Sequence, residues 1–229
     1  GRLIAQELAE VGIDVNCAPL GDIAGAATHP RLQNRCYGTD AASVIARARA
    51  VVEGQLAGGV LPVLKHIPGH GSATKDSHVD LPRVTTPKEA LAAHDFAPFT
   101  ALSDLPMGMT AHVVFTAYDD ARPATTSALM HRVIRDEIGF DGLLMTDDLS
   151  MEALAGSVTD RCAGALSAGC DVILHCNGVL EEMEEVAAFG PLSPEAEARA
   201  AHALSWRRAP DDVDIDALRT DLQSLMEAA

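Results

Sequence analysis

Short apolar runs alternate along the chain with longer segments in which apolar residues recur at helical spacing. The runs have the length and branched side chains of buried strands, and turn residues bound them. The predicted strands are residues 13–20, 60–68, 105–115, 142–148 and 170–177, and the predicted helices between them are residues 40–59, 86–102, 126–140 and 150–169. Several of these helices open on a Thr, Ser or Asp that can cap the first turn. The repeat of strand and helix predicts an α/β fold with a parallel sheet.

The composition favours one large domain with an aliphatic core, and it argues against nucleic-acid binding and a membrane span. The 229 residues fit one large domain, 1–229, and its core must come from Ala, Val, Leu and Ile, because 48% of the chain is hydrophobic and only 3% aromatic. The net charge of −16, from 33 acidic residues against 17 Lys and Arg, lacks the basic surface that nucleic acid requires. No apolar run reaches the roughly 20 residues of a membrane span. We therefore expect neither a nucleic-acid partner nor a membrane span.

The cysteines indicate a reducing environment. There are five, an odd number, and no two have C-x-x-C spacing, so neither a disulfide framework nor a zinc knuckle is expected. The opening segment, 1–12, has the pattern of an amphipathic helix and not of a signal peptide. Together these features predict a cytoplasmic protein with reduced thiols.

Polar side chains follow four of the five predicted strands, at or just beyond the point where each strand ends. They are Asp22, Lys65, His66, His112, Asp147 and Asp148. The carboxyl ends of parallel strands are where a (β/α)8 barrel builds its site, and an open doubly wound sheet binds ligands in a crevice at the same ends. A complete barrel typically has eight units in about 250 residues. Because five strands are found here, the pattern leaves both architectures open.

The segment KHIPGHGSATKDSHVD, residues 65–80, concentrates titratable side chains between glycines and a proline. Its cationic or titratable members include Lys65, His66, His70 and His78. Such a set could ligate a metal, bind an anionic or sugar ligand, or transfer protons. The segment by itself does not decide among these functions.

Four motifs carry a resemblance to a known family. They are KHIPGHG at 65–71, KDSHVDLP at 75–82, MTAHVVF at 109–115 and the stretch over 123–154 that contains LLMTDDLSM. Together they resemble the glycoside hydrolase family 3 β-N-acetylglucosaminidases of bacterial peptidoglycan recycling, the NagZ type. The resemblance extends over roughly three quarters of the chain and implies a TIM-like (β/α)8 barrel, of which about five strand–helix units are present. It implies a small-molecule sugar as the partner and neither a metal nor another cofactor.

The family has three strands and their loops before the point that corresponds to Gly1, including a DQEGGRV-like loop whose aspartate holds the sugar. Without them, the strands near Asn16 and Leu174 would be open edges, whereas a closed barrel has no edges. We therefore expect those strands, or a swapped neighbour, to cover both edges.

The resemblance also assigns the catalytic groups. It places the nucleophile of a retaining glycosidase on Asp147 and leaves Asp148 to form local hydrogen bonds. The general acid and base would be His78, whose imidazole titrates near pH 6.5 and can give and take a proton, with Asp76 orienting it. From the residues alone, Asp147 could instead cap the following helix, and Asp76 and His78 could be a solvated loop pair.

The same resemblance assigns the sugar-binding groups. Lys65 and His66 would bind the N-acetylglucosamine ring together with Arg35, which lies in NRCYG where the family has an RSFG-like turn. The implied substrate is a peptidoglycan-derived muropeptide of the GlcNAc-anhydroMurNAc type. Its terminal N-acetylglucosamine would be removed through a covalent glycosyl-enzyme intermediate.

Several other residues are expected to support the site. His70 and Gly71 should shape the turn after the second strand, and His112 should line the floor of the site. Asp22 should be structural, and Met151 should lie in the core.

Two other functions stay open. Lysine, histidine and aspartate at barrel strand ends also suit a metal-dependent amidohydrolase, although the sequence contains no H-x-H pair. The other is a catalytically silent sugar-binding protein. Metal analysis, together with turnover of a chromogenic N-acetylglucosaminide by the full-length protein, distinguishes the three hypotheses.

Overall fold

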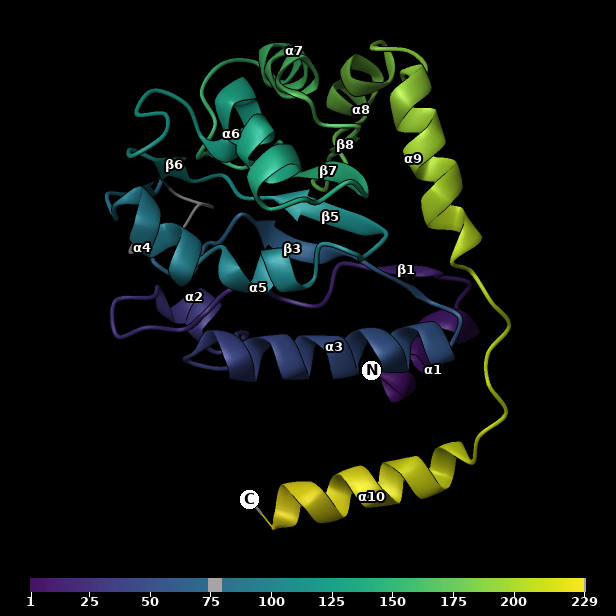
Figure 1. The fold of residues 1–229 in the computed structure, drawn as a ribbon. Coiled ribbons are helices and arrows are strands. Elements are labelled where there is room, and N and C mark those ends of the chain that lie inside the picture. The colour runs from purple at the N-terminus through teal and green to yellow at the C-terminus, as the bar shows by residue number, and fades with distance from the viewer. Residues whose placement is uncertain (74–79, 229) are drawn as a thin grey trace.

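A computed structural model describes residues 1–73 and 80–228 (Figure 1). Its strands are β1 (Val15–Asn16), β2 (Leu61–Pro62), β3 (Leu64–Ile67), β4 (Arg83–Val84), β5 (Met107–Thr110), β6 (Val114–Phe115), β7 (Leu143–Asp148) and β8 (Val172–Leu174). Its helices are α1 (Arg2–Glu10), α2 (Pro30–Gln33), α3 (Ala41–Ala57), α4 (Lys88–Ala93), α5 (Ala97–Ala101), α6 (Ala128–Arg132), α7 (Val158–Ala168), α8 (Leu180–Ala187), α9 (Pro194–Ser205) and α10 (Ile215–Glu227), with the 3-10 turn η1 (Ala124–Thr126) and the π-helical turn η2 (Val133–Glu137). All strand pairs in the described ranges are parallel. The predicted α/β fold is confirmed.

The main strands pair in chain order. β3, β5, β7 and β8 form one sheet in that order, and β1 pairs with β2, which directly precedes β3. A parallel bridge between Leu20 and Lys65 pairs the segment that follows β1 with β3. A doubly wound sheet reverses its strand order at a switch point, whereas the strands of a barrel follow one another around it. The observed order is therefore that of a barrel, and α3, α5 and α6 lie along its outer side in Figure 1.

Alternate strand residues face two separate apolar cores, as the two-residue period of a strand requires. The cluster on one face includes Met107, Met109, Leu143 and Met145. Leu144, between the last two, packs instead in the larger cluster to which α3, α5 and α6 contribute. Helix α9 covers part of the first face, because Ala203 belongs to its cluster.

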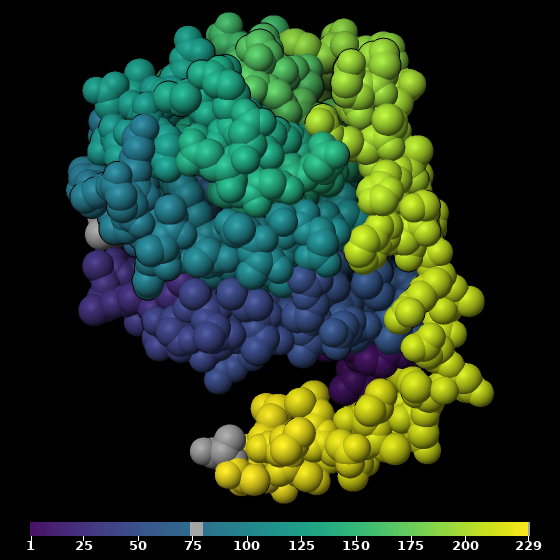
Figure 2. Space-filling model, in the orientation of Figure 1, coloured from purple at the N-terminus to yellow at the C-terminus, as the bar shows by residue number. Residues whose placement is uncertain are grey.

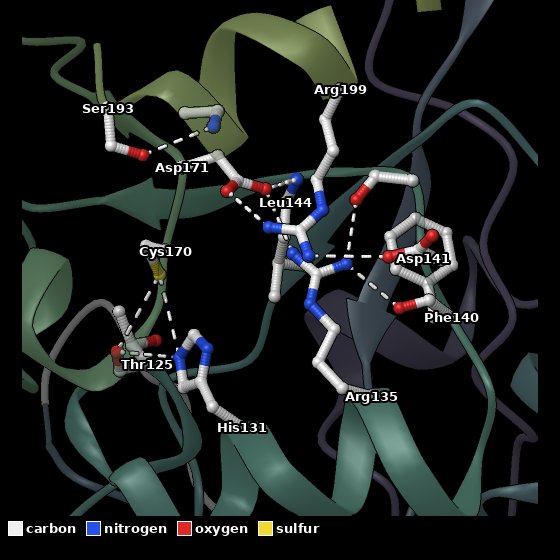
Figure 3. Close-up of polar contacts among 12 residues, drawn as sticks. Thr125, His131, Arg135, Phe140, Asp141, Leu144, Cys170, Asp171, Ser193 and Arg199 are labelled. Carbon is white, nitrogen blue, oxygen red and sulfur yellow. Dashed lines mark hydrogen bonds and ion pairs between the residues drawn. The ribbon is translucent and has the colours of Figure 1, made fainter. Parts of the chain in front are cut away.

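A buried aspartate ties the amino-terminal ends of β7 and β8 to two helical elements (Figure 3). Asp171, which precedes β8, is 6% exposed and accepts a hydrogen bond from the N–H of Leu144 at 2.8 Å. Arg135 of η2 and Arg199 of α9 each donate to the same carboxylate at 2.9 Å. These contacts, which we call the Asp171 network, lie at the end of the sheet opposite to the predicted site. In a barrel this end serves stability.

Two predicted helices differ from the observed ones. The helix expected over 150–169 begins only at Val158, because Ser157 and Asp160 form a capping box there. The helix expected over 86–102 is two helices, α4 and α5, with a short break between them.

Of the elements beyond residue 170, the strand at 170–177 was predicted, and helix α8 (Leu180–Ala187) was not. The last predicted strand is present as the shorter β8, and the tail forms α9 and α10 with a break between them. The break is held against the body, because Arg208 and the N–H of Asp211 donate to carbonyls at the end of α3, both at 2.8 Å. Helix α10 contacts α1 and otherwise projects below the body in Figure 2.

Two expectations from the sequence concern the edge strands of the sheet and membrane-spanning helices. Within the described residues, β1 has one partner strand, β2, and β8 has one, β7. Val15, Cys17 and Ile173 at these edges are half-buried, and the covering of both edges by further strands or a neighbour stays a prediction. The helices in the described part of the chain include none that is long and apolar enough to cross a membrane.

Replacing Asp171 by alanine is expected to lower the free energy of unfolding by about 3 kcal/mol, because two arginines and a buried N–H lose their acceptor. Asp141→Ala is the matched control. Asp141 also bonds Arg199, at 3.3 Å, but its side chain is 91% exposed, so its loss should change stability by less than about 0.5 kcal/mol. Urea denaturation measures both variants. Equal losses would contradict the importance of the buried network.

Candidate active site

The carboxyl-terminal ends of β3 and β7 bring a histidine and an aspartate together. His66 lies in β3 and Asp147 in β7, and only β5 separates these strands in the sheet. His66 Nε2 is 4.0 Å from Asp147 Oδ2. The Asp147 side chain is 18% exposed and that of His66 only 7%. The carboxylate is therefore reachable from solvent, while its histidine neighbour is nearly enclosed.

Neighbouring groups keep Asp147 ionised. Burial by itself would raise the pKa of its carboxyl, but two histidines, a backbone N–H and Lys65 outweigh burial and hold that pKa below its ordinary value. The histidines are His66 and His112, and the N–H belongs to Asp148, which donates to Asp147 Oδ1 at 2.9 Å. An ionised and accessible carboxylate can attack an electrophilic carbon or stabilise a positive charge.

Lys65 and Arg35 bring positive charge to the same end of the sheet. The pKa of the half-buried Lys65 is lowered, first by burial and then by the nearby Arg35 charge, while two carboxylates and a thiol act in the opposite direction. Arg35 follows α2 and is exposed. The structure thus brings Lys65, His66 and Asp147 together, with Arg35 close to Lys65.

Asp22 is fully buried, and its carboxylate contacts three nitrogen atoms of His66 and His70. Its Oδ2 lies 2.7 Å from His66 Nδ1 and 3.3 Å from the His66 backbone nitrogen, and its Oδ1 accepts from the His70 N–H at 2.7 Å. Asp22 therefore has the structural role expected for it. It also contacts one of the predicted sugar-binding residues directly.

The turn at 68–71 packs tightly against the loop at 22–28. A Cβ added to Gly71 would lie 2.0 Å from the carbonyl oxygen of Ile23, so no larger residue fits there. The Gly71 carbonyl also accepts from the Thr28 hydroxyl at 2.5 Å. These contacts agree with the turn-shaping role expected from the sequence.

His112 is buried beneath the turn that follows β7. Its Nε2 lies 3.0 Å from the carbonyl oxygen of Asp148, and its Nδ1 lies 2.7 Å from the Thr125 hydroxyl. A carbonyl oxygen only accepts, so Nε2 carries the proton. Burial lowers the pKa of His112, which favours the neutral ring. His112 is fully buried and bonds to the backbone at the end of β7, so the expectation that it lines the floor of the site stays a prediction.

Asp148 links the end of β7 to the segment that follows β8. Its Oδ1 accepts from the N–H groups of Ser150 at 3.0 Å and Cys176 at 3.1 Å, and its Oδ2 accepts from the Ser150 hydroxyl at 2.6 Å. These are the local bonds expected for Asp148. The next helix of the described chain begins at Val158, so the interpretation of Asp147 as a helix cap is wrong.

The predicted acid–base pair, Asp76 and His78, lies outside the described residues. Among residues 1–73 and 80–228, no group of three or more His, Cys, Asp or Glu side chains is placed to hold a metal ion. The amidohydrolase hypothesis gains no support from this part of the chain.

Two cysteines near the site were missed by sequence reasoning. Burial raises the pKa of Cys17, and the charges of Lys65 and Asp147 also act on it. Burial likewise raises the pKa of Cys176, followed by the charges of the two aspartates that end β7. Their positions near the ends of the first and last strands were the available signal.

The sequence of this chain is similar to those of known glycosyl hydrolases. Residues 1–204 match the family model of the glycosyl hydrolase family 3 N terminal domain. A beta-hexosaminidase from Alkalilimnicola ehrlichii is 40% identical over 182 residues, which are 77% of this chain and 52% of that protein. One from Vibrio cholerae is 39% identical over 183 residues, 77% of this chain and 54% of that protein. The chain thus spans about half the length of the curated relatives it matches.

Solved structures show the same likeness. NagZ from Neisseria gonorrhoeae, in complex with N-trifluoroacetyl-D-glucosamine, matches with a TM-score of 0.79 at 30% identity, over 97% of this chain and 63% of that one. This match supports the barrel fold derived from the strand order.

The Asp147 carboxyl is expected to titrate below the ordinary aspartate pKa of about 3.9. Lys65→Met removes one of the cations that lower this pKa and should raise it. Lys88→Met should leave it unchanged. The Lys88 ammonium lies over the Tyr118 ring, whereas the charges that lower the Asp147 pKa are those of His66, His112 and Lys65. Carbon-13 NMR titration measures all three proteins, with the Asp147 signal identified by its loss in Asp147→Asn. An Asp147 pKa above the ordinary value would refute this electrostatic arrangement.

Proposed function

The chain belongs to glycosyl hydrolase family 3, and from this premise we propose that the protein hydrolyses β-linked N-acetylglucosaminides. Membership rests on the family match over residues 1–204 and on a relative at 40% identity. The curated relatives are described as beta-hexosaminidases, and the Neisseria NagZ structure contains N-trifluoroacetyl-D-glucosamine. The observation that carries the proposal is an ionised, partly exposed carboxylate, Asp147, beside His66 at the carboxyl end of a parallel sheet.

Asp147 is the proposed nucleophile. One of its carboxylate oxygens bonds to the anomeric carbon while the bond from that carbon to the leaving oxygen breaks, and the leaving oxygen keeps the electron pair. Water then attacks the same carbon, and the ester bond to Asp147 breaks. Two successive inversions retain the β-configuration. The neighbours that lower the pKa of Asp147 support this role, since they keep it in the ionised form that attacks.

His78 is the proposed acid and base. It protonates the leaving oxygen in the first step and accepts a proton from the attacking water in the second, while Asp76 orients the ring. An imidazole suits both steps because its ordinary pKa lies near the operating pH. The support for this pair is its family motif.

Lys65, His66 and Arg35 are proposed to bind the sugar hydroxyls, because ammonium and guanidinium groups donate hydrogen bonds and an unprotonated imidazole nitrogen accepts one. The proposed substrate is the terminal N-acetylglucosamine of GlcNAc-anhydroMurNAc muropeptides in the cytoplasm, a reducing compartment that suits five free cysteines. Mass spectrometry after incubation of such a muropeptide with the full-length protein tests the substrate. A disaccharide left intact would reject it.

Hydrolysis is expected to retain configuration, so that proton NMR should detect the β-anomer of N-acetylglucosamine first. Asp147→Ala should lower kcat by at least about 10³-fold with folding unchanged. Asp141→Ala, at the opposite end of the sheet, should keep full turnover. An α-anomer appearing first would rule out the double displacement. No turnover by the unmodified full-length protein would favour the silent sugar-binding hypothesis.

His78→Ala is expected to slow substrates with poor leaving groups far more than activated aryl glycosides, which hardly need protonation. Asp76→Ala should show the same pattern more mildly. His94→Ala, which changes a histidine whose side chain is 53% exposed, is the control and should affect neither class. Steady-state kinetics on both substrate classes measures the contrast, and equal losses for His78→Ala would indicate a structural role.

A further inference from the structure

A short ladder of backbone hydrogen bonds places Asp22 beside His66. The N–H of Gly21 donates to the Lys65 carbonyl at 2.7 Å, and the N–H of Lys65 donates to the Pro19 carbonyl at 3.0 Å. These bonds align the segment after β1 with β3. The residue that follows the ladder, Asp22, is therefore set against the His66 side chain by the sheet itself.

The Asp22 carboxylate is enclosed, with both oxygens engaged. It is 0% exposed, its Oδ2 faces His66 Nδ1 at 2.7 Å, and its Oδ1 accepts from the His70 N–H at 2.7 Å. Burial by itself would raise the pKa of Asp22, but the charges and hydrogen bonds of the two histidines hold it below its ordinary value. An ionised carboxylate can only accept hydrogen bonds, so Nδ1 of His66 carries a proton.

We propose that Asp22 is a positioning residue: by accepting a hydrogen bond from the Nδ1–H of His66, it leaves Nε2 as the ring atom that faces Asp147 and the bound sugar. Nε2 lies 4.0 Å from Asp147 Oδ2. The His70 ring packs edge-on against the His66 ring, with centroids 5.6 Å apart, and helps to hold its orientation. In the neutral ring, Nε2 then presents a lone pair that accepts a hydrogen bond from a sugar hydroxyl. The role toward the sugar rests on the proposed function, whereas the tautomer does not.

Asp22→Asn should reverse this arrangement of protons. Neither backbone N–H that bonds Asp22 can become an acceptor, and the amide oxygen of the new side chain would stay with the shorter contact, at His70 (2.7 Å), rather than at the His66 N–H (3.3 Å). The amide NH2 group would then face His66 Nδ1, which would have to accept. In the neutral ring the proton would move to Nε2 and point at Asp147. Nε2 would no longer accept from the sugar, and a hydrogen bond to Asp147 would weaken the nucleophile.

We expect Asp22→Asn to lower activity less than the same exchange does in a Ser-His-Asp triad. In Ser-His-Asp triads, exchanging the aspartate for asparagine leaves the histidine in the wrong tautomer and lowers kcat about 10⁴-fold. In that case the histidine itself transfers the proton, whereas His66 is proposed only to bind sugar and face the nucleophile. We therefore expect Asp22→Asn to lower kcat/KM by about 10- to 100-fold, the range found for groups that orient metal-binding histidines.

Nitrogen-15 NMR of the histidine side chains in the full-length protein reads the tautomer directly, at about pH 9, where an ordinary histidine ring is neutral. The His66 signals are identified by their loss in His66→Gln. The unmodified protein should carry the proton on Nδ1, and Asp22→Asn should carry it on Nε2. Asp171→Asn is the matched control, because Asp171 is also buried and accepts from three donors. It should leave the His66 tautomer and kcat/KM unchanged.

Three results would overturn the proposal: a proton on Nε2 in the unmodified protein, a proton on Nδ1 in Asp22→Asn, or a reversed tautomer with unchanged kcat/KM. If Asp22→Asn does not fold, the spectrum of the unmodified protein decides, because Nδ1 protonation supports the proposal and Nε2 protonation refutes it. If the tautomer reverses as expected but the full-length protein hydrolyses no N-acetylglucosaminide, the proposed function fails. The orientation of His66 by Asp22 would then still stand.

Discussion

Parallel pairing of strands in chain order is the constraint on which the rest of the structure depends. The strands of the four-stranded sheet pair in the order in which they occur in the chain, with only the separately paired β4 and β6 between them. Because all these pairs are parallel, the carboxyl ends of β3, β5, β7 and β8 lie on one side of the sheet. His66 and Asp147 come from separate motifs and meet only because β3 and β7 end at that side. The same pairing sets Asp22 against His66 through the bonds between the β1 segment and β3.

Most strand positions could be predicted from the sequence, because buried parallel strands are short and continuously apolar. Strand β4 (Arg83–Val84), which lies outside every predicted strand, was missed. The choice between a barrel and a doubly wound sheet could not, since it depends on non-local pairs such as Leu20 with Lys65. The late start of α7 at Val158 has a similar cause. Asp148 bonds to Ser150 and to the chain beyond β8, and holds a turn where local spacing predicted a helix.

The position of a candidate site residue was predictable where a reactive side chain lies near the carboxyl end of a strand, as for Lys65, His66 and Asp147. The bond between Asp22 and His66 was not, because it joins residues 44 apart in sequence. The approach of their loops also depends on a glycine at position 71, where no Cβ fits. Local spacing contains none of this information. The acid–base pair stays a prediction carried by its motif.

The Asp171 network has a consequence for how the fold forms and persists. Its arginine bonds span 36 residues to Arg135 and 28 to Arg199. Chain segments of that length must close before the bonds can form, whereas the helices they connect form from local contacts. Interactions completed after the rate-limiting step slow unfolding and leave the folding rate nearly unchanged. We therefore expect the network to govern the lifetime of the folded sheet, and with it resistance to proteolysis, more than the speed of its assembly.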